Sequence, residues 1–165
     1  MSAGFLEREV FLCVAENAPL VSIDLIITRM GGKEVLLGKR RNPPAEGWWF
    51  VPGGRIRKGE SHAEAFRRIT ASELGEEIAF EQAKMLGSWA HLYPEEAFRG
   101  QKEKGIHYVT LGYQIEYNLP PAALPKEQHE NFRWFTLKEA LTSPKVHKYT
   151  RLYLEALQAS HERQK

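Results

Sequence analysis

The segment GGRIRKGESHAEAFRRITASELG, residues 53–75, constrains the fold of this chain more than any other part of the sequence. Ser61 followed by Glu64 forms a capping box, which predicts the start of a helix, and Gly75 is the residue type at which helices commonly end. The aromatic segment WWFVPGG precedes this helix and is typical of a short strand that ends in a glycine turn. A strand, a glycine turn and a capped helix in direct succession indicate an α/β domain whose turn lets a ligand approach the backbone.

The rest of the chain intersperses strand and helix patterns. Residues 5–16 and 149–159 carry apolar side chains at helical spacing, so a helix is expected near each end. At 165 residues, with no internal repeat, the chain suits one mixed α/β domain that spans residues 1–165. The expected strands are the apolar and β-branched segments 20–28, 35–40, 85–93, 107–117 and 131–136, against which Trp48, Trp49 and Trp134 are expected to pack.

Composition and charge exclude several classes of protein. The formal net charge is only +2 and no basic tail is present, so a general nucleic-acid binder is not expected. The N-terminus lacks the basic and apolar regions of a signal peptide, and no apolar run approaches the roughly 20 residues of a membrane span. The single cysteine, Cys13, leaves no internal disulfide and is expected to be a small buried side chain. These features predict a cytoplasmic protein without a membrane or nucleic-acid partner.

The last turns of the expected helix determine what kind of metal site it can build. Positions 69, 72 and 73 lie on one side of a helix, where three carboxylates would hold one or more Mg²⁺ ions. Here Ile69 and Ser72 leave Glu73 as the single acid. The preceding glycine pair, Gly53–Gly54, allows a backbone carbonyl to serve as a further ligand. The pattern predicts a site with low capacity for metal.

Basic side chains flank the glycine turn. Arg40 ends one expected strand and Arg55 follows the glycine pair, and two arginines can clamp a diphosphate through fork-like hydrogen bonds. Arg68 is expected to pair with Glu60 across the start of the helix rather than to touch a substrate. By themselves these residues predict a one-metal diphosphate site.

The segment that begins at Gly54 resembles the Nudix box, G-x5-E-x7-R-E-U-x-E-E-x-G-U, in which U is an apolar residue. Two glutamates of the box are replaced by Ile69 and Ser72, and two of its apolar places hold Thr70 and Glu76. The resemblance implies a Nudix-type α/β/α sandwich with a mixed β-sheet. The positions that match in register are Gly54, Glu60, Arg68, Glu73 and Gly75.

In lacking those two glutamates, the sequence resembles one subgroup of this family, the GDP-mannose mannosyl hydrolases. The segments PLVSIDLI, LLGKRRNPPAEGWWFVPGGR, HYVTLGY and EQHENFRWF also resemble it, so the similarity runs from about residue 18 to beyond residue 150. The resemblance implies hydrolysis of GDP-mannose, or GDP-glucose, to GDP and free sugar. Water would attack the anomeric carbon with inversion, whereas most Nudix enzymes cleave a P–O bond. Attack at carbon needs one metal ion to neutralise the diphosphate, so one helical acid suffices.

The resemblance also implies a role for individual residues. Mg²⁺, for which Mn²⁺ could substitute, would be held by the carbonyl of Gly53 and the side chains of Glu73 and Gln128. Such a cage with one carboxylate should bind metal weakly until substrate phosphate oxygens complete it.

The catalytic residues implied by the resemblance come from separate parts of the chain. His129 would be the general base, Arg40 would assist departure of GDP, and Asp24 would stabilise positive charge at the anomeric carbon. Glu127 and Glu130 lie near His129 and are expected to favour its charged form, so activity would need a pH above neutrality. The implied substrate-binding residues are Arg55, Tyr108 and His91.

Two alternatives remain open at this stage. One is a conventional Nudix pyrophosphohydrolase that cleaves a P–O bond, which the residues at positions 69 and 72 disfavour. The other is a catalytically silent nucleotide-sugar sensor, which the pair Gln128–His129 disfavours because binding alone needs no placed base. Members of the subgroup are homodimers, so a homodimer is expected here, with the helical segment 1–17 at the interface.

Overall fold

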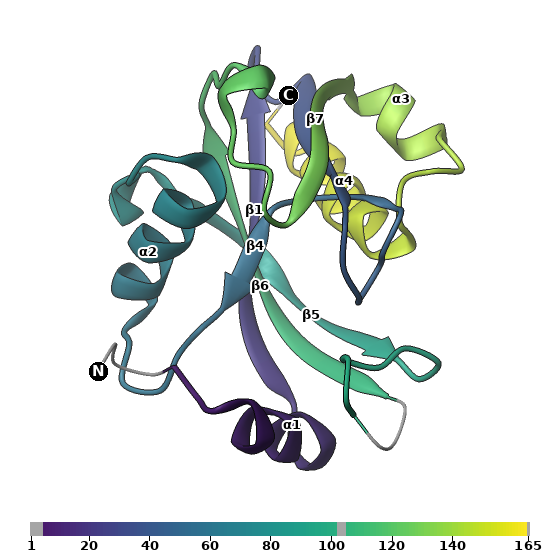
Figure 1. The fold of residues 1–165 in the computed structure, drawn as a ribbon. Helices are drawn as coiled ribbons and strands as arrows, with labels where there is room; N and C mark the ends of the chain where they lie inside the picture. The colour runs from purple at the N-terminus through teal and green to yellow at the C-terminus, as the bar shows by residue number, and fades with distance from the viewer. Residues whose placement is uncertain (1–4, 102–104, 165) are drawn as a thin grey trace.

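The computed structural model describes residues 5–101 and 105–164. Seven strands form one sheet in the order β3-β2-β1-β6-β5, with β4 pairing to β1 and β7 pairing to β2 (Figure 1). The segments 20–28, 35–40, 85–93, 107–117 and 131–136 are strands, within two residues at either end. The segment WWFVPGG was expected to be one short strand before a glycine turn, but it is divided between two strands, and the glycine pair begins the second of them. The strands are β1 (Leu20–Arg29), β2 (Glu34–Arg40), β3 (Trp49–Phe50), β4 (Gly53–Arg55), β5 (Lys84–Tyr93), β6 (Ile106–Glu116) and β7 (His129–Thr136).

Four α-helices and two short 3-10 helices complete the described part of the chain. In the sheet, β1 runs parallel to β6, while β2 and β4 are antiparallel to β1, so the sheet is mixed as expected. The helices are α1 (Arg8–Asn17), α2 (His62–Leu74), α3 (Leu137–Thr142) and α4 (Lys148–Glu162), and the 3-10 helices are η1 (Phe80–Gln82) and η2 (Pro121–Ala123).

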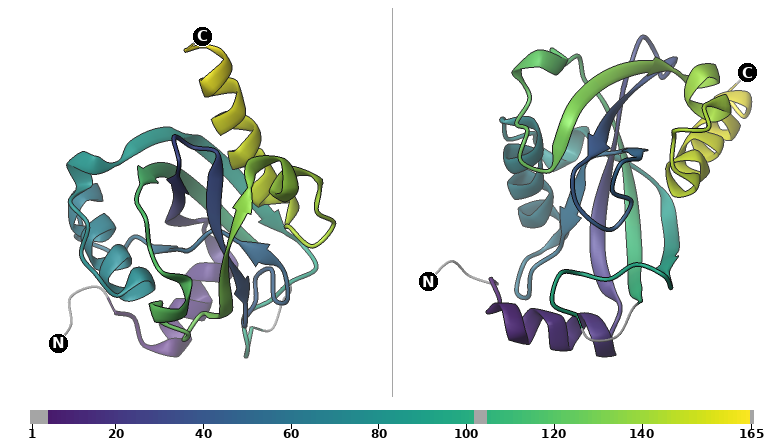
Figure 2. Two further views of the ribbon diagram at one scale, coloured as in Figure 1. Left: turned by 90° about the horizontal axis from the view of Figure 1, so that it is seen from above. Right: turned by 45° about the vertical axis from the view of Figure 1, so that its right-hand side comes forward.

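Helix α2 covers one face of the sheet, and α3 and α4 lie on the other (Figures 1 and 2). Strand β1 is buried on both faces, and its side chains alternate between the two layers. Ile23 and Leu25 pack with Phe66 of α2, whereas Ile26 packs with Leu154 of α4. The expected α/β/α sandwich is therefore confirmed, and even-numbered positions of β1 face α4.

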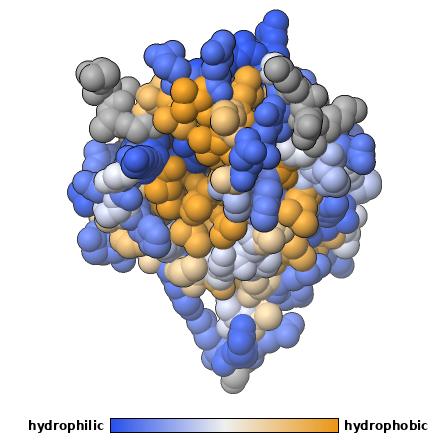
Figure 3. Space-filling model, turned by 90° about the horizontal axis from the view of Figure 1, so that it is seen from below, coloured by the Kyte–Doolittle hydropathy of each residue, from blue (hydrophilic) through white to orange (hydrophobic). Residues whose placement is uncertain are grey.

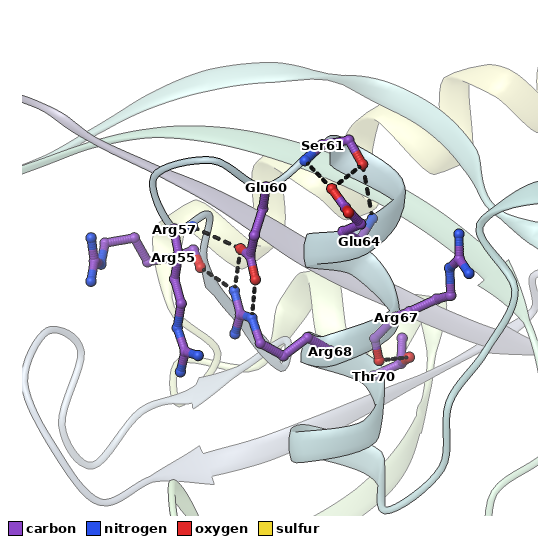
Figure 4. Close-up of polar contacts among 8 residues, drawn as sticks. All are labelled: Arg55, Arg57, Glu60, Ser61, Glu64, Arg67, Arg68 and Thr70. Atoms are coloured by element: carbon purple, nitrogen blue, oxygen red, sulfur yellow. Dashed lines mark hydrogen bonds and ion pairs between the residues drawn. The ribbon is translucent and has the colours of Figure 1, made fainter. Parts of the chain in front are cut away.

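Helix α2 begins and ends where its caps predicted. The hydroxyl of Ser61 accepts a hydrogen bond from the amide of Glu64, whose carboxylate accepts one from the amide of Ser61 (Figure 4). Gly75 ends the helix in the left-handed conformation, with φ of 79°. These contacts are local in sequence, which is why the residues alone predicted them.

The pairing of Arg68 with Glu60 is also confirmed. Two nitrogens of the Arg68 guanidinium lie 2.5 and 2.8 Å from the two carboxylate oxygens of Glu60. The same guanidinium donates a 2.9 Å hydrogen bond to the backbone carbonyl of Arg55 (Figure 4). Arg68 thereby joins α2 to β4 and holds the turn that carries the glycine pair.

Helix α1 crosses the end of the sheet where β1 begins (Figure 1) and buries only Ala15. Cys13, expected to be buried, is exposed, because the apolar stripe of α1 turns away from the sheet. Val10 on this stripe is 50% exposed and Val14 is 36% exposed. The helix was predicted from its periodicity, but the partner of its apolar side does not lie in the described part of this chain.

The three tryptophans expected to pack in the sheet differ in their exposure. Trp49 and Trp134 are half-buried and pack against the two cores, as expected. Trp48 is 40% exposed, so the expectation that it packs in the sheet is wrong. It lies just before β3, and its ring meets that of His147 in an edge-to-face contact with ring centroids 5.4 Å apart.

Candidate active site

A cleft of about 280 Å³ opens beside β1, β4 and the last turn of α2. Part of its wall comes from β5 and β6, and the loop after β2 closes one side. All but one of the predicted site residues line it, although they come from distant parts of the sequence. These are Asp24, Arg40, Gly53, Arg55, Glu73, His91, Tyr108 and Gln128.

Glu73 is the acid that α2 presents to the cleft. It is buried, and no described donor hydrogen-bonds its carboxylate; Nδ1 of His129, 3.7 Å away, is its nearest charged or chargeable partner. Burial raises the pKa of Glu73 to about 7, and the negative charges of Glu127 and Asp24 act in the same direction while Arg40 opposes them. Among the described residues, the Glu73 carboxylate therefore has no lysine or arginine in direct contact to compensate its charge.

The two positions at which the glutamates of the Nudix box are replaced do not contribute to the cleft. Ile69 is 1% exposed and packs in the core under α2, and Ser72 is exposed. Among residues 5–101 and 105–164, no three His, Cys, Asp or Glu side chains gather closely enough to hold a metal ion. Helix α2 therefore offers the cleft a single carboxylate.

Gly53 lies where β4 meets β1, opposite Asp24. A Cβ atom at position 53 would lie 2.5 Å from the carbonyl oxygen of Ile23 and 2.7 Å from Oδ1 of Asp24. Only glycine allows this approach, which brings the backbone of β4 into the cleft beside Asp24.

Two arginines supply positive charge to the cleft. Arg40, at the end of β2, is held by a 2.8 Å hydrogen bond from its Nε to the carbonyl of Pro44. Arg55 is half-buried, and its guanidinium carbon lies 5.2 Å from the ring centroid of Phe11 in α1. Burial lowers the pKa of Arg55, the expected cost of holding a cation in a cleft without an anion bound.

Polar side chains from β1, β5 and β6 gather in one part of the cleft. Asp24 is 7% exposed, and burial raises its pKa to about 6 although Tyr153 and Arg40 lower it. His91 stacks on Tyr149 with ring centroids 4.1 Å apart, and burial, with His147 nearby, lowers its pKa to about 4. Burial also raises the pKa of Tyr108 to about 12. His91 and Tyr108 are therefore neutral at physiological pH.

His129 does not line the cleft. It is the first residue of β7, is 1% exposed, and packs between Gly38 and Phe132, with the His129 and Phe132 ring centroids 4.9 Å apart. Its Nε2 is buried and has no hydrogen-bond partner in the described part of the chain. The expectation that nearby acids favour the charged form is wrong for this conformation, since burial, reinforced by Arg40, lowers the pKa of His129 to about 3.

Comparisons with known proteins agree with this architecture. The model of the Nudix domain family matches residues 18–157. The low-salt glycan biosynthesis protein Agl8 of Haloferax volcanii is 36% identical over 145 residues, covering 87% of this chain and 85% of that protein. The chain belongs to the Nudix family.

Solved structures of Nudix proteins share its fold. A MutT Nudix hydrolase from Burkholderia pseudomallei superposes with a TM-score of 0.65 at 29% identity, over 85% of this chain and 98% of that one. The Nudix domain of Shewanella oneidensis NrtR, solved with ADP ribose, gives 0.61 at 21% identity, over 97% of this chain and 100% of that one. Nudix hydrolases act on derivatives of nucleoside diphosphates and generally use divalent metal ions.

The donors in this Nudix cleft fit such an ion. The uncompensated Glu73 carboxylate, the Gln128 amide and the backbone at Gly53 line the same cleft, and oxygen donors are the ligands that Mg²⁺ and Mn²⁺ accept.

Several lining residues were not predicted from the sequence. Ser22 lies two positions before Asp24 on β1, and Tyr93 lies two positions after His91 on β5. Because alternate residues of a strand share a face, each could have been inferred from its predicted neighbour. Thr110 pairs across the sheet with Ser22, and Phe98 meets Phe11 of α1 with ring centroids 5.1 Å apart. Thr110 also lies two positions after Tyr108 on β6, so the same rule could have found it, whereas Phe98 depends on a contact between distant segments.

No described helix is long and apolar enough to cross a membrane.

Proposed function

We propose that this Nudix enzyme hydrolyses GDP-mannose or GDP-glucose to GDP and the free sugar, by attack of water on the anomeric carbon. The observation that carries the proposal is the composition of α2, where Ile69 is part of the core and Ser72 is exposed, so that only Glu73 faces the cleft. The Haloferax volcanii relative is named for glycan biosynthesis, and a nucleotide sugar is a substrate consistent with that name.

Attack on phosphorus requires a metal-activated water near an anionic centre, which favours several metal ions and several carboxylates. Attack on the anomeric carbon places different demands on the site. The water oxygen bonds to the carbon, the carbon–oxygen bond to the β-phosphate breaks, and its electron pair leaves with GDP. The site must therefore neutralise the diphosphate and accept one proton from water. One helical carboxylate and two arginines suit this reaction.

In this proposal the diphosphate lies against Arg40 and Arg55. Glu73, Gln128 and the carbonyl of Gly53 would hold one Mg²⁺ or Mn²⁺ ion, which would neutralise charge on the leaving GDP. Phe98 lines the cleft and contacts Phe11, which lies beside Arg55, and these apolar rings suit a nucleobase. The sugar would lie toward Asp24, His91 and Tyr108, where the Asp24 carboxylate can stabilise developing positive charge.

His129 remains the proposed general base, but its ring has to reach the cleft for this role. The pairing of β2 with β7 is irregular between Gly38 and Arg40, at the point where His129 lies. Gln128, the neighbouring residue, is already exposed to the cleft. A shift of the first residues of β7 would expose a neutral imidazole, the form that accepts a proton.

Incubation with GDP-mannose and Mg²⁺ in water enriched in oxygen-18, followed by mass spectrometry of both products, tests the proposal. Label on mannose with unlabelled GDP is the expected result. Label on a phosphate would contradict attack at carbon and would favour the pyrophosphohydrolase alternative. Binding of GDP-mannose without turnover would favour a nucleotide-sugar sensor.

The proposal includes a homodimer. Apolar side chains gather on the face of the molecule that carries α1 (Figure 3). Val21 at the start of β1 is 40% exposed and Leu92 near the end of β5 is 52% exposed, in addition to Val10 and Val14 of α1. An exposed apolar surface of this kind commonly marks a protein interface.

A further inference from the structure

The hydroxyl of Tyr153 lies at the centre of a buried cluster behind the cleft. Tyr153 belongs to α4, is 0% exposed and does not line the cleft. Its hydroxyl donates a short hydrogen bond to Oδ2 of Asp24, and its oxygen lies 3.2 Å from Nε2 of His91 and 3.0 Å from Oγ1 of Thr110. These three partners all line the cleft, and each comes from a different strand.

The proton count of this cluster fixes the direction of its contacts with Asp24 and His91. A phenol has one proton and two acceptor sites. The carboxylate of Asp24 is the strongest acceptor in reach, so the proton of Tyr153 points to it. Toward His91 the phenol oxygen can then only accept, which requires a proton on Nε2 of the neutral imidazole. The Nδ1 atom of His91 is left without a proton and serves as an acceptor.

We infer that Tyr153 is a positioning residue, which orients the Asp24 carboxylate and selects the His91 tautomer for the substrate in the cleft. The packing of Tyr153 supports this role. Its ring contacts Trp89 edge-on at 4.8 Å between centroids and lies beneath Gly112 of β6, so the hydroxyl cannot swing away from Asp24. An Asp24 side chain that rotates freely would lose its alignment with the reacting carbon, and small misplacements of this kind cost rate.

The test is a double-mutant cycle with Tyr153→Phe and Asp24→Asn, and it rests on the proposed function only for its substrate. Tyr153→Phe removes the hydroxyl and keeps the packed ring. In the wild-type background we expect kcat for GDP-mannose to fall about 10-fold or more, and the Kd of GDP to stay within about twofold. In the Asp24→Asn background the same change should lower kcat by less than about twofold, because the group it acts through is already altered.

Tyr149→Phe is the matched control. Tyr149 belongs to the same helix and stacks on His91, but among the described residues its hydroxyl bonds only to the backbone of Leu92. Its removal should leave kcat within about twofold. An equal loss from Tyr153→Phe in both backgrounds, or no loss in either, would overturn the inference.

A second measurement needs neither the variant nor a substrate. Nitrogen-15 NMR of the wild-type imidazoles should show His91 as the neutral tautomer with its proton on Nε2. A proton on Nδ1 would contradict the role assigned to Tyr153. Product analysis of the wild type reports separately on the proposed function; if a sugar phosphate is released instead, the same cycle on that reaction still decides whether Tyr153 acts through Asp24.

Discussion

At the scale of single residues, burial decides which groups of this site can change charge. Asp24 and Glu73 are acids whose pKa is raised by burial to about 6 and about 7, while His91 and His129 are bases whose pKa is lowered to about 4 and about 3. In both cases a low-dielectric surrounding disfavours the charged form. The site therefore holds neutral imidazoles beside two carboxyl groups whose charged form a nearby cation would stabilise.

His129→Gln tests the proposed base. Glutamine keeps polar atoms near the same place but cannot accept a proton from water. We expect kcat for release of mannose to fall by about 10²-fold or more with KM changed by less than about threefold. The control is Glu130→Gln, which removes only an exposed 3.4 Å ion pair with Lys39. Near-complete turnover in the His129 variant would exclude it as the base.

At the scale of elements, the caps at the first residues of α2 and α4 help to position the site. Helix α2 begins at a capping box and carries Glu73 in its last turn, so its start sets the register of the acid. Helix α4 is capped by His147, whose Nδ1 accepts a 3.1 Å hydrogen bond from the amide of Tyr149. Both caps also contribute to stability, and each can be removed by one substitution.

Ser61→Ala removes the side-chain cap of α2. We expect the free energy of unfolding to fall by about 1 kcal/mol, because the amide of Glu64 loses its acceptor and the Glu64 carboxylate loses the hydroxyl donor. Ser72→Ala on the same helix is the matched control, since Ser72 is exposed and contributes no cap; its effect should stay within about 0.5 kcal/mol. Urea unfolding followed by circular dichroism measures both, and equal effects would show that the cap is not stabilising.

His147→Asn tests the link between pH and the cap of α4. Burial, with Lys148 and Arg151 nearby, lowers the pKa of His147 from 6.5 to about 4. The unfolded chain takes up the proton first as pH falls below 6.5, so the stability that His147 contributes is complete above this pH and is lost toward pH 4. Asparagine can also cap the helix but does not titrate.

Between pH 7.5 and pH 5 we therefore expect the wild type to lose about 2 kcal/mol more stability than the His147→Asn variant. Urea unfolding at the two pH values measures the difference. Parallel losses in both proteins would mean that His147 is already charged or already solvated in the folded state.

At the scale of the whole molecule, the sheet brings together residues that are far apart in the chain, and α1 leaves an apolar surface uncovered. Strand β1 contributes Asp24, β5 contributes His91 and α4 contributes Tyr153, although Asp24 and Tyr153 are 129 positions apart. The apolar stripe of α1, by contrast, has no partner in the described part of the chain, which supports the proposed homodimer.

Val10→Glu combined with Val14→Glu tests that surface. Two charges in an apolar interface would be costly to bury, so sedimentation velocity should show a dimer for the wild type and a monomer for the double variant. Met30→Glu, at a more exposed apolar residue in the turn between β1 and β2, should remain dimeric. A wild-type monomer, or a double variant that still dimerises, would exclude α1 from the interface.

The sequence by itself determined the strands, the caps of α2, the Arg68–Glu60 pair and the single acid at Glu73. These features follow from periodicity, from capping and from a spaced motif, all of which act over a few neighbouring residues. The family resemblance also identified eight of the residues that line the cleft, and the strand period of two could have added Ser22, Tyr93 and Thr110.

Only the tertiary structure decided the exposure of Cys13 and Val10, the burial of His129, and the contact of Tyr153 with Asp24. A helical stripe shows that one side of a helix is apolar, but not which surface, if any, covers it. Likewise, local sequence places His129 beside Gln128 but does not say which of them faces the cleft, because that depends on how β7 pairs with β2. Contacts between distant segments arise from the packing of whole layers, and the pattern of neighbouring residues does not encode that packing.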